Sequence, residues 1–232
     1  MAEPTIGFIS GTGPQGRGLA MRFALAGLDV VIGSRSDERA QGVADELNEI
    51  AAKHTKAGGP ALRHMRGMEN KAMVAASDYV LLTVPFEHAE TTMEALAGDF
   101  KEGSVFVDVT VPLDFSKGDC MVVVPPAGSG SLQLRKVVPA GTPFLGAFKT
   151  LPAHVLEEIG MEMGCDTFVF GDNKEAKQHF MKVVARIPTL RPVDVGGLSA
   201  AATVEGMTAL AIRINRRWKM KNARFHIVGR DE

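Results

Sequence analysis

The stretch that decides the fold lies near the start of the chain and reads Gly11-Thr12-Gly13-Pro14-Gln15-Gly16-Arg17-Gly18. An apolar run precedes it and an amphipathic run follows, the setting in which a G-x-G-x-x-G pattern marks a dinucleotide-binding turn. In that turn Gly11 permits the tight bend, Gly13 leaves the backbone open to a diphosphate, and Gly16 lets the helix approach the sheet. Pro14 suits the first turn of the helix, whose free N–H groups bind phosphate. The alternative is a glycine-rich turn that binds no ligand.

Short apolar runs alternate with amphipathic segments on both sides of this turn. We expect strands at 5–10, 29–33, 61–66, 78–84, 104–110, 121–124, 143–148 and 167–170. We expect helices at 14–26, 36–53 (capped by Ser36), 69–76, from 87 onward, and at 152–163, 173–186 and 199–219. Strands separated by helices imply right-handed crossovers and a mostly parallel sheet. The pattern predicts an α/β fold of the doubly wound Rossmann type. We expect a dinucleotide-binding domain over residues 1–150 and a smaller C-terminal α/β part over 151–232 for substrate binding or dimerisation.

The end of the second predicted strand indicates which dinucleotide binds. An NAD-binding fold places Asp or Glu there, about 20 residues after the glycines, whereas this chain has Ser34 and Arg35, with Arg39 one helical turn further on. A carboxylate would repel a 2′-phosphate. Ser34 can donate a hydrogen bond, Arg35 can stack on adenine or pair with the phosphate, and Arg39 adds a second cation. The sequence therefore predicts NADP(H); the alternative is that both arginines are solvated surface cations.

The composition excludes several other classes of protein. With 26 Lys+Arg against 27 Asp+Glu in 232 residues, the chain lacks the basic excess of a nucleic-acid binder. Its two cysteines provide neither a disulfide framework nor a zinc site and read as small buried hydrophobes. The six histidines show no metal-ligand spacing, and no uncharged apolar run reaches the roughly 18 residues that a membrane span needs. We therefore expect a cytoplasmic protein with no metal, membrane or nucleic-acid partner.

With these residues taken together, the chain resembles the F420-dependent NADP reductases, also called NADPH:F420 oxidoreductases. The matching stretches follow the same order over nearly the whole chain: 11–20, 33–35, 67–70, 83–88, 150–153, 190–192 and 197–199, followed by 204–205. The stretch Thr83-Val84-Pro85-Phe86-Glu87-His88 is more distinctive than the glycine turn. The resemblance implies a Rossmann domain, a small C-terminal part that lines a cleft, and a homodimer. It also implies hydride transfer between C4 of the nicotinamide and C5 of the deazaflavin F420.

The resemblance also gives roles to individual positions. It implies that the diphosphate meets Thr12, Gly13, Pro14 and Gln15. It implies that the nicotinamide half lies beside Thr83, Val84, Pro85, Val111 and Ala153. It implies that the deazaflavin side involves Phe86, Thr150, Leu198 and Ser199. Hydride transfer between two stacked heterocycles chiefly requires that two carbons are held face to face in a dry cleft. We therefore predict no catalytic side chain.

Two departures from the family pattern fall on the substrate side. Family members commonly have His before the Thr-x-Pro stretch, where this chain has Lys149, and residues 118–143 also differ, with Pro125-Pro126 where a longer helix is usual. A Lys149 ammonium suits an anionic or carbonyl-bearing substrate; the alternative is an exposed lysine at the end of a strand. His88 is a candidate to contact either substrate, or an inert polar residue of the first helical turn.

These departures leave two other functions open. An NADPH-dependent reductase of a small carbonyl or imine would need a proton donor, for which Lys149 and His88 are the candidates. A dinucleotide-binding protein without turnover would use the same fold.

The last predicted helix ends in an unusual charge pattern. No acid occurs between Gly206 and Gly229, whereas six cations do: Arg213, Arg216, Arg217, Lys219, Lys221 and Arg224. One interpretation is that these cations stabilise the C-terminus of the helix, where positive charge is favourable. The other is a docking surface for an anionic tail, such as the phosphate and glutamates of F420.

Overall fold

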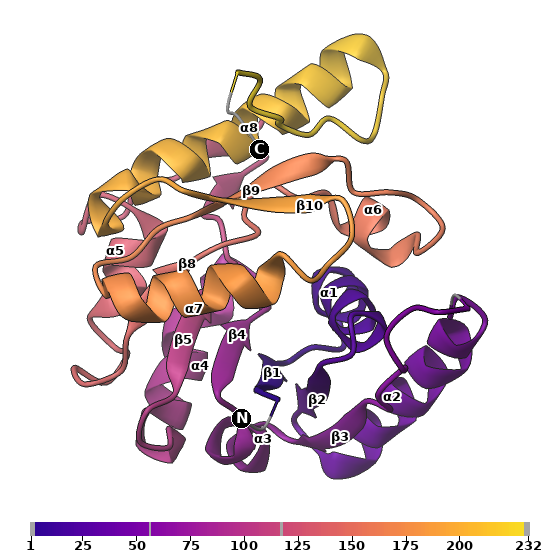
Figure 1. The fold of residues 1–232 in the computed structure, drawn as a ribbon. Helices are drawn as coiled ribbons and strands as arrows, with labels where there is room; N and C mark the ends of the chain where they lie inside the picture. The colour runs from indigo at the N-terminus through magenta and orange to yellow at the C-terminus, as the bar shows by residue number, and fades with distance from the viewer. Residues whose placement is uncertain (1–2, 56, 117, 230–232) are drawn as a thin grey trace.

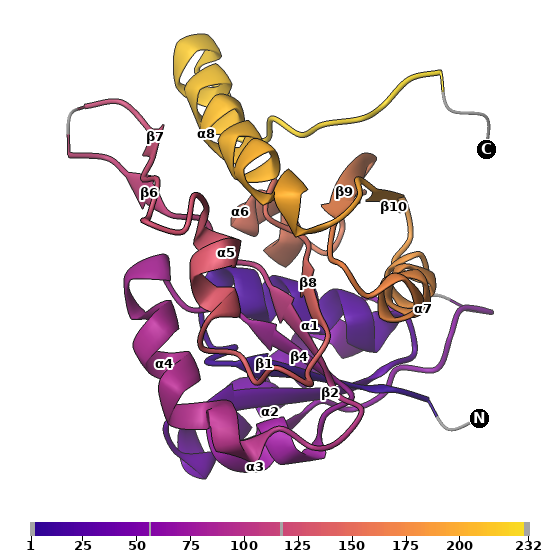
Figure 2. The same cartoon turned by 90° about the vertical axis from the view of Figure 1, so that its left-hand side faces the viewer.

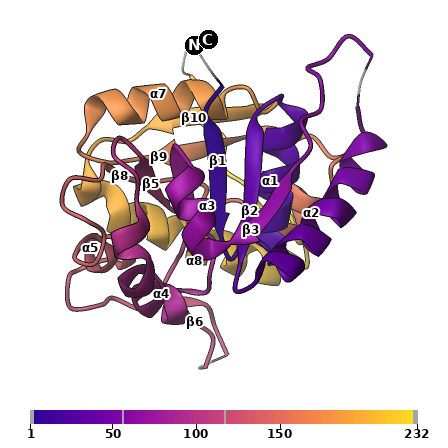
Figure 3. The same cartoon turned by 90° about the horizontal axis from the view of Figure 1, so that it is seen from below.

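The centre of the structure is a parallel sheet of six strands. The computed structural model describes residues 3–55, 57–116 and 118–229. Its strands lie in the order β3-β2-β1-β4-β5-β8, and every pairing in the sheet is parallel. They are β1 (Thr5–Ile9), β2 (Asp29–Ser34), β3 (Arg66–Glu69), β4 (Tyr79–Leu82), β5 (Val105–Asp108) and β8 (Phe144–Gly146). Strand β1 lies in the middle of the sheet (Figure 3), and the predicted Rossmann-type α/β fold is confirmed.

Helices cover both faces of this sheet. One apolar core joins it to α1 (Pro14–Leu25), α2 (Asp37–Ala52), α6 (Ala153–Glu157) and α7 (Lys174–Val184). A second core joins the other face to α3 (Asn70–Ala76), α4 (Ala89–Leu96) and α5 (Gly130–Arg135). Short 3-10 turns flank α4 at Phe86–His88 and Ala97–Asp99. The sheet is thus doubly wound, and the loops at its carboxyl edge are free to build a site.

The C-terminal part lies against that edge. It contains a parallel pair, β9 (Cys165–Val169) and β10 (Leu190–Asp194), which a bridge between Gly146 and Phe170 links to β8. A 3-10 turn (Leu198–Ala200) leads into the long helix α8 (Ala201–Trp218), which lies at the top of the molecule (Figure 1). The predicted division at residue 150 follows the end of the large sheet and stays a prediction.

A short hairpin projects from the body beside α8. It pairs β6 (Leu113–Asp114) with β7 (Met121–Val122) in antiparallel fashion, and Figure 2 shows it standing away from the sheet. We call residues 113–124, excluding Lys117, which lies outside the described residues, the arm. The predicted strand at 121–124 is therefore part of this arm and does not continue the parallel sheet.

Other sequence predictions need correction. The strand expected at 61–66 is wrong, because β3 begins at Arg66, and the helix expected at 152–163 ends at Glu157. Helix α5 and strand β10 were not predicted. The predicted cap is confirmed: the Ser36 hydroxyl accepts a hydrogen bond from the Arg39 N–H at 3.4 Å.

Two glycines of the first helix set how closely it packs. A Cβ on Gly16 would lie 2.7 Å from the Gly11 Cα, and one on Gly18 would lie 2.5 Å from the Leu156 Cβ. Any larger residue would therefore push α1 away from the turn before it or away from α6. Gly13 differs, because a Cβ there would meet no described atom within 4 Å.

The cysteines and the helices bear on two other expectations. Cys120 and Cys165 are free, buried thiols, and burial raises the pKa of Cys165 to about 11, as expected of small core residues and not of nucleophiles. None of the described helices is long and apolar enough to cross a membrane.

Candidate functional site

A large cavity opens at the carboxyl edge of the sheet. It has a volume of about 580 Å³ and is lined by residues that belong to distant parts of the sequence. One wall is the turn before α1, a second is formed by the ends of β4 and β5, and a third by residues 149–154. Helix α8 and the chain after it supply the fourth. The strand order reverses between β1 and β4, which is where doubly wound sheets bind their ligands.

The turn before α1 leaves hydrogen-bond donors free. The backbone N–H of Gly11 binds the Gly33 and Phe8 carbonyls, at 3.0 and 3.2 Å, which closes the turn. No described side chain caps the N-terminus of α1, and Gly13 faces open space. The first N–H groups of the helix and the positive end of its dipole therefore point toward the cavity, an arrangement that suits a diphosphate.

Three polar side chains fix this turn against its neighbours. The Gln15 Nε2 donates to the Phe148 carbonyl at 3.2 Å, and the Thr83 hydroxyl donates to the Ile9 carbonyl at 2.9 Å. Asn70 accepts the Ser10 N–H at 3.0 Å, and Ser10 has the unusual φ of +54°. Sequence reasoning assigned no role to Asn70, although it ends the stretch 67–70 that carried part of the family resemblance.

The residues predicted to select NADP lie just beyond β2, outside the cavity lining. Ser34 is buried at the end of the strand, while Arg35 and Arg39 are exposed. The nearby Asp37 carboxylate is already engaged, because it accepts the Glu69 N–H at 2.6 Å. The two arginines are thus exposed cations at the carboxyl end of β2 and the start of α2.

Lys149 lies at the floor of the cavity, and its ammonium is surrounded by protein. Its side chain is 0% exposed, so the reading as an exposed lysine is wrong. The Nζ lies 2.7 Å from the Asp108 Oδ2 and 3.7 Å from the Glu205 Oε1, and it also donates to the Thr110 carbonyl. Phe148, just before it, has the unusual φ of +59°. A burial of this kind requires paired charges.

Both carboxylates of this cluster are further hydrogen-bonded. Glu205, from α8, accepts the backbone N–H groups of Gly130 and Ser131 at 2.9 and 3.0 Å. The Ser131 hydroxyl lies 2.6 Å from the Asp108 Oδ2 and 3.1 Å from the Glu205 Oε1. The cluster of Lys149, Asp108, Glu205 and Ser131 therefore ties β5, α5, α8 and the 149–154 wall together.

The structure brings many of the predicted site residues into one cavity. Those that line it are Gly13, Pro14, Gln15, Thr83, Val84, Pro85, Phe86, Val111, Lys149, Thr150 and Ala153. Gly11, Thr12 and Gly16 belong to the adjoining turn. Three others lie apart from the lining: His88 is exposed, the Leu198 N–H binds the Asp172 carboxylate at 3.0 Å, and Ser199 follows it. Of the thirteen other lining residues, six come from α8 and the chain after it: Thr208, Ala211, Ile212, Asn215, Lys221 and Ala223. Among these six, the sequence singles out only Lys221, as part of the basic segment.

Comparison with known proteins agrees with this geometry. Residues 5–112 match the family described as NADP oxidoreductase, coenzyme F420-dependent. The F420-dependent NADP reductase of Methanothermobacter thermautotrophicus is 33% identical over 230 residues, which cover 98% of this chain and 96% of that protein. The chain belongs to the F420-dependent NADP reductase family. The reductase of the same name from Methanocaldococcus jannaschii is 32% identical, with 96% of this chain and 97% of that protein covered.

The fold of this reductase-family chain recurs in a solved structure. A protein from Arthrobacter sp. FB24, provisionally named an F420-dependent NADP reductase, superposes with a TM-score of 0.77. The match covers 98% of this chain and 100% of the other at 21% identity, so it supports the fold alone.

Replacing Lys149 by Met should destabilise the protein strongly. The change leaves two buried carboxylates without their cation, and breaking a buried ion pair in this way costs about 3–5 kcal/mol in the free energy of unfolding. Urea denaturation measures the loss. Lys136→Met, a change at an exposed lysine, serves as the control and should shift the free energy by less than about 0.5 kcal/mol. Equal midpoints for the two variants would contradict the proposed charge pairing.

Proposed function

We propose that this chain transfers a hydride between NADP(H) and a deazaflavin of the F420 type in the cytoplasm. The observation that carries the proposal is the similarity, over nearly the whole chain, to proteins named F420-dependent NADP reductases. The cavity supports it, because it adjoins an uncapped helix N-terminus and is large enough for ring systems. The two unpaired cysteines agree with a reducing compartment.

The coenzyme is proposed to bind along the carboxyl edge of the sheet. Thr12, Gly13, Pro14 and Gln15 are assigned to the diphosphate. Ser34, Arg35 and Arg39 are assigned to the 2′-phosphate. Five residues are assigned to the nicotinamide half, and all five line the cavity: Thr83, Val84, Pro85, Val111 and Ala153. Each group then meets a wall of suitable character: free N–H groups and cations for phosphate, and a largely apolar surface for the ring.

The acceptor is proposed to lie between the nicotinamide and the fourth wall of the cavity. Bound there, the deazaflavin supplies the carbon that exchanges a hydride with the nicotinamide. Phe86 and Thr150 contribute apolar and polar contacts, and His88, Leu198 and Ser199 stay predictions at a greater distance. The protein holds the two rings together and excludes water, so no acid, base or metal is needed. The buried, paired state of Lys149 disfavours its use as a proton donor for a carbonyl substrate.

We further propose that the protein is a homodimer that buries the arm and the exposed side of α8. Large apolar side chains are exposed on these neighbouring elements: Phe115, Met121, Val123, Val124, Leu210, Trp218 and Met220. Val124 is 70% and Trp218 75% exposed. A clustered set of this kind is typical of an interface and not of a surface in contact with water.

Purified protein should oxidise NADPH when F420 is supplied, and the visible absorbance of the deazaflavin should disappear with matching stoichiometry. A panel of small carbonyls and imines, tested in parallel, should give no turnover. Turnover with carbonyls alone would replace the proposal by the carbonyl-reductase alternative. NADPH binding without any turnover would favour a non-catalytic dinucleotide-binding protein.

Arg35→Ala should weaken NADP binding by about 1.5–3 kcal/mol and leave NAD binding nearly unchanged, because it removes a charge-assisted contact to the 2′-phosphate. Isothermal calorimetry with both coenzymes gives the two affinities. Arg66→Ala is the matched control, because Arg66 lies at the amino end of the neighbouring strand β3, and it should change neither the NADP affinity nor the NAD affinity. Equal losses for NADP and NAD in Arg35→Ala would mean that this arginine supports the fold.

Trp218→Glu should convert the proposed dimer into a monomer, because it places a charge within the proposed apolar interface. Sedimentation velocity at several protein concentrations detects the change. Val228→Glu, at a side chain that is 88% exposed on the C-terminal tail, is the control and should leave the assembly intact. A wild-type protein that sediments as a monomer at every concentration would rule the dimer out.

A further inference from the structure

Of the six cations in the basic segment 213–224, three contact other parts of the protein, two are exposed away from the cavity, and one lines the cavity. Arg213 pairs with Asp119 at 3.1 Å, and the Arg224 guanidinium donates to the Glu162 carbonyl at 3.0 Å. Arg216 donates to the Gly118 carbonyl at 3.2 Å and lies over the ring of Phe115. Arg217, Lys219 and Lys221 are all exposed, and of these three Lys221 is the one that lines the cavity.

The chain around Lys221 is held in place by backbone contacts. Helix α8 ends at Trp218, and its C-cap residue Lys219 has a φ of +52° that turns the chain back toward the cavity. The Met220 N–H binds the Asn215 carbonyl at 2.9 Å. The Asn215 side chain accepts the Ala223 N–H at 2.9 Å. Lys221 therefore lies inside a tight loop and not on a free end.

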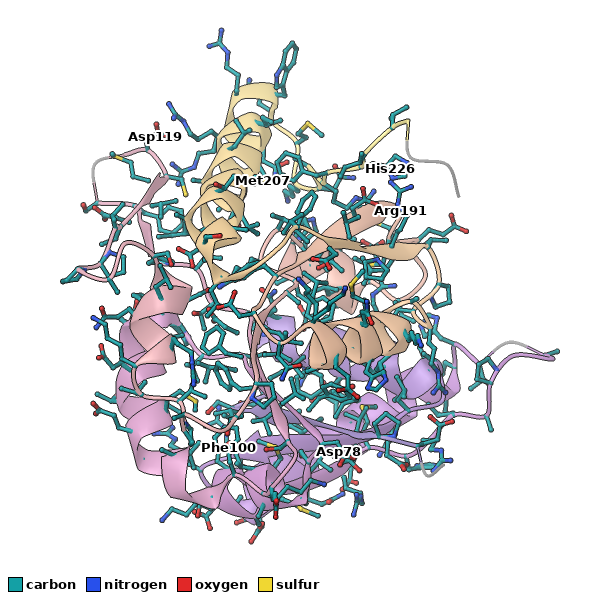
Figure 4. All side chains as sticks on the ribbon, turned by 60° about the vertical axis from the view of Figure 1, so that its left-hand side comes forward. Asp78, Phe100, Asp119, Arg191, Met207 and His226 are labelled. Atoms are coloured by element: carbon teal, nitrogen blue, oxygen red, sulfur yellow. The ribbon has the colours of Figure 1, made fainter. Side chains whose placement is uncertain are left out.

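Further along, the C-terminal tail (residues 222–229) is fastened to β9. The Phe225 carbonyl accepts the Asp166 N–H at 2.8 Å, and the Asp166 carboxylate accepts the Ile227 N–H at 2.6 Å. Arg191 binds the same carboxylate at 2.7 and 3.0 Å. Figure 4 shows His226 of the tail close to Arg191. These contacts fix the direction in which the tail leaves α8.

The charge of Lys221 is unmatched. The lining includes two lysines, but Asp108 and Glu205 neutralise Lys149. Within the part of the chain that the structure describes, Lys221 has no ion-pair or hydrogen-bond partner. In Figure 1 the loop that carries it lies on the far side of α6 from α1, away from the diphosphate turn. An unpaired ammonium on that wall attracts an anion that the coenzyme turn does not already serve.

We infer that Lys221 binds an anionic group, a phosphate or a carboxylate, carried by the acceptor substrate on a side chain remote from its redox ring. The inference rests on the proposed function and narrows the substrate class. It also replaces the broad docking surface that the sequence suggested by one residue, because Arg213, Arg216 and Arg224 are engaged elsewhere. A neutral acceptor of the same ring system would occupy the cavity without using this contact.

The test compares two acceptors in three variants. The acceptors are F420 with its phosphate-bearing side chain and a deazaflavin with the same ring and a neutral side chain. Lys221→Gln should raise the KM for F420 roughly tenfold and leave kcat, the KM for the neutral deazaflavin and the NADPH affinity unchanged. Lys221→Arg should restore the KM. Arg217→Gln, which removes a charge from the same segment outside the cavity, is the control and should behave as wild type. Added salt should reduce the difference in the KM for F420 between Lys221→Gln and the wild type, because salt screens the charge of Lys221.

The remaining outcomes each overturn the inference. A rise in KM for both acceptors means that Lys221 supports the shape of the cavity, and a loss confined to NADPH means that it serves the coenzyme. If the wild type is active and Lys221→Gln has the same KM for F420, Lys221 does not contact the anion, and the proposed function stands. A wild-type protein that turns over neither deazaflavin removes both.

Discussion

The cavity depends on one buried ammonium. Lys149 is the cation at which three walls meet: Asp108 and the Thr110 carbonyl from the end of β5, Glu205 from α8, and its own 149–154 segment. Two carboxylates could not lie this close together in a dry interior without it, since unpaired buried charges cost several kcal/mol each. Helix α8 also touches the same segment through Thr208, whose hydroxyl donates to the Lys149 carbonyl at 2.9 Å. The spacing of the walls is therefore set by charge pairing as well as by apolar packing.

The two sides of the cavity are built by different means. On the side of α1, the cavity wall is formed by backbone groups and by positions without a side chain. These are the free N–H groups, the open face of Gly13 and the close approach at Gly16. These need only local sequence, and one strand–turn–helix unit supplies them. On the side of α8, side chains from β5, the 149–154 segment, α8 and the tail converge over long sequence separations. The α1 side therefore suits a ligand that many proteins of this fold bind, whereas the α8 side suits a ligand specific to this protein family.

This difference explains how much could be predicted. The glycine turn, the Ser36 cap and the buried strands β1, β2, β4 and β5 follow from local pattern, and the structure has them. The burial and charge pairing of Lys149 do not follow from local pattern. Its partner Asp108 is 41 residues away, and no periodicity in the sequence predicts this pairing. Helix α5 is only six residues long and follows Pro125-Pro126, so it reads as a loop. Strand β3 has no continuous apolar run, and its place is fixed by pairing with β2.

The tail that follows the Lys221 loop is fixed by an interaction that persists at neutral pH. Burial opposes the ionisation of Asp166, but hydrogen bonds from Arg191 and the Ile227 N–H outweigh it, and the pKa of the carboxyl lies below its usual range. A carboxyl whose pKa is lowered on folding stabilises the folded state above its unfolded pKa, about 4. That stabilisation is lost only as the pH falls through the lowered value. Around pH 7 the carboxylate is therefore fully ionised and holds the tail against β9. The loop before the tail is thus ordered in advance, so a ligand anion that meets Lys221 need not pay the entropy of ordering it.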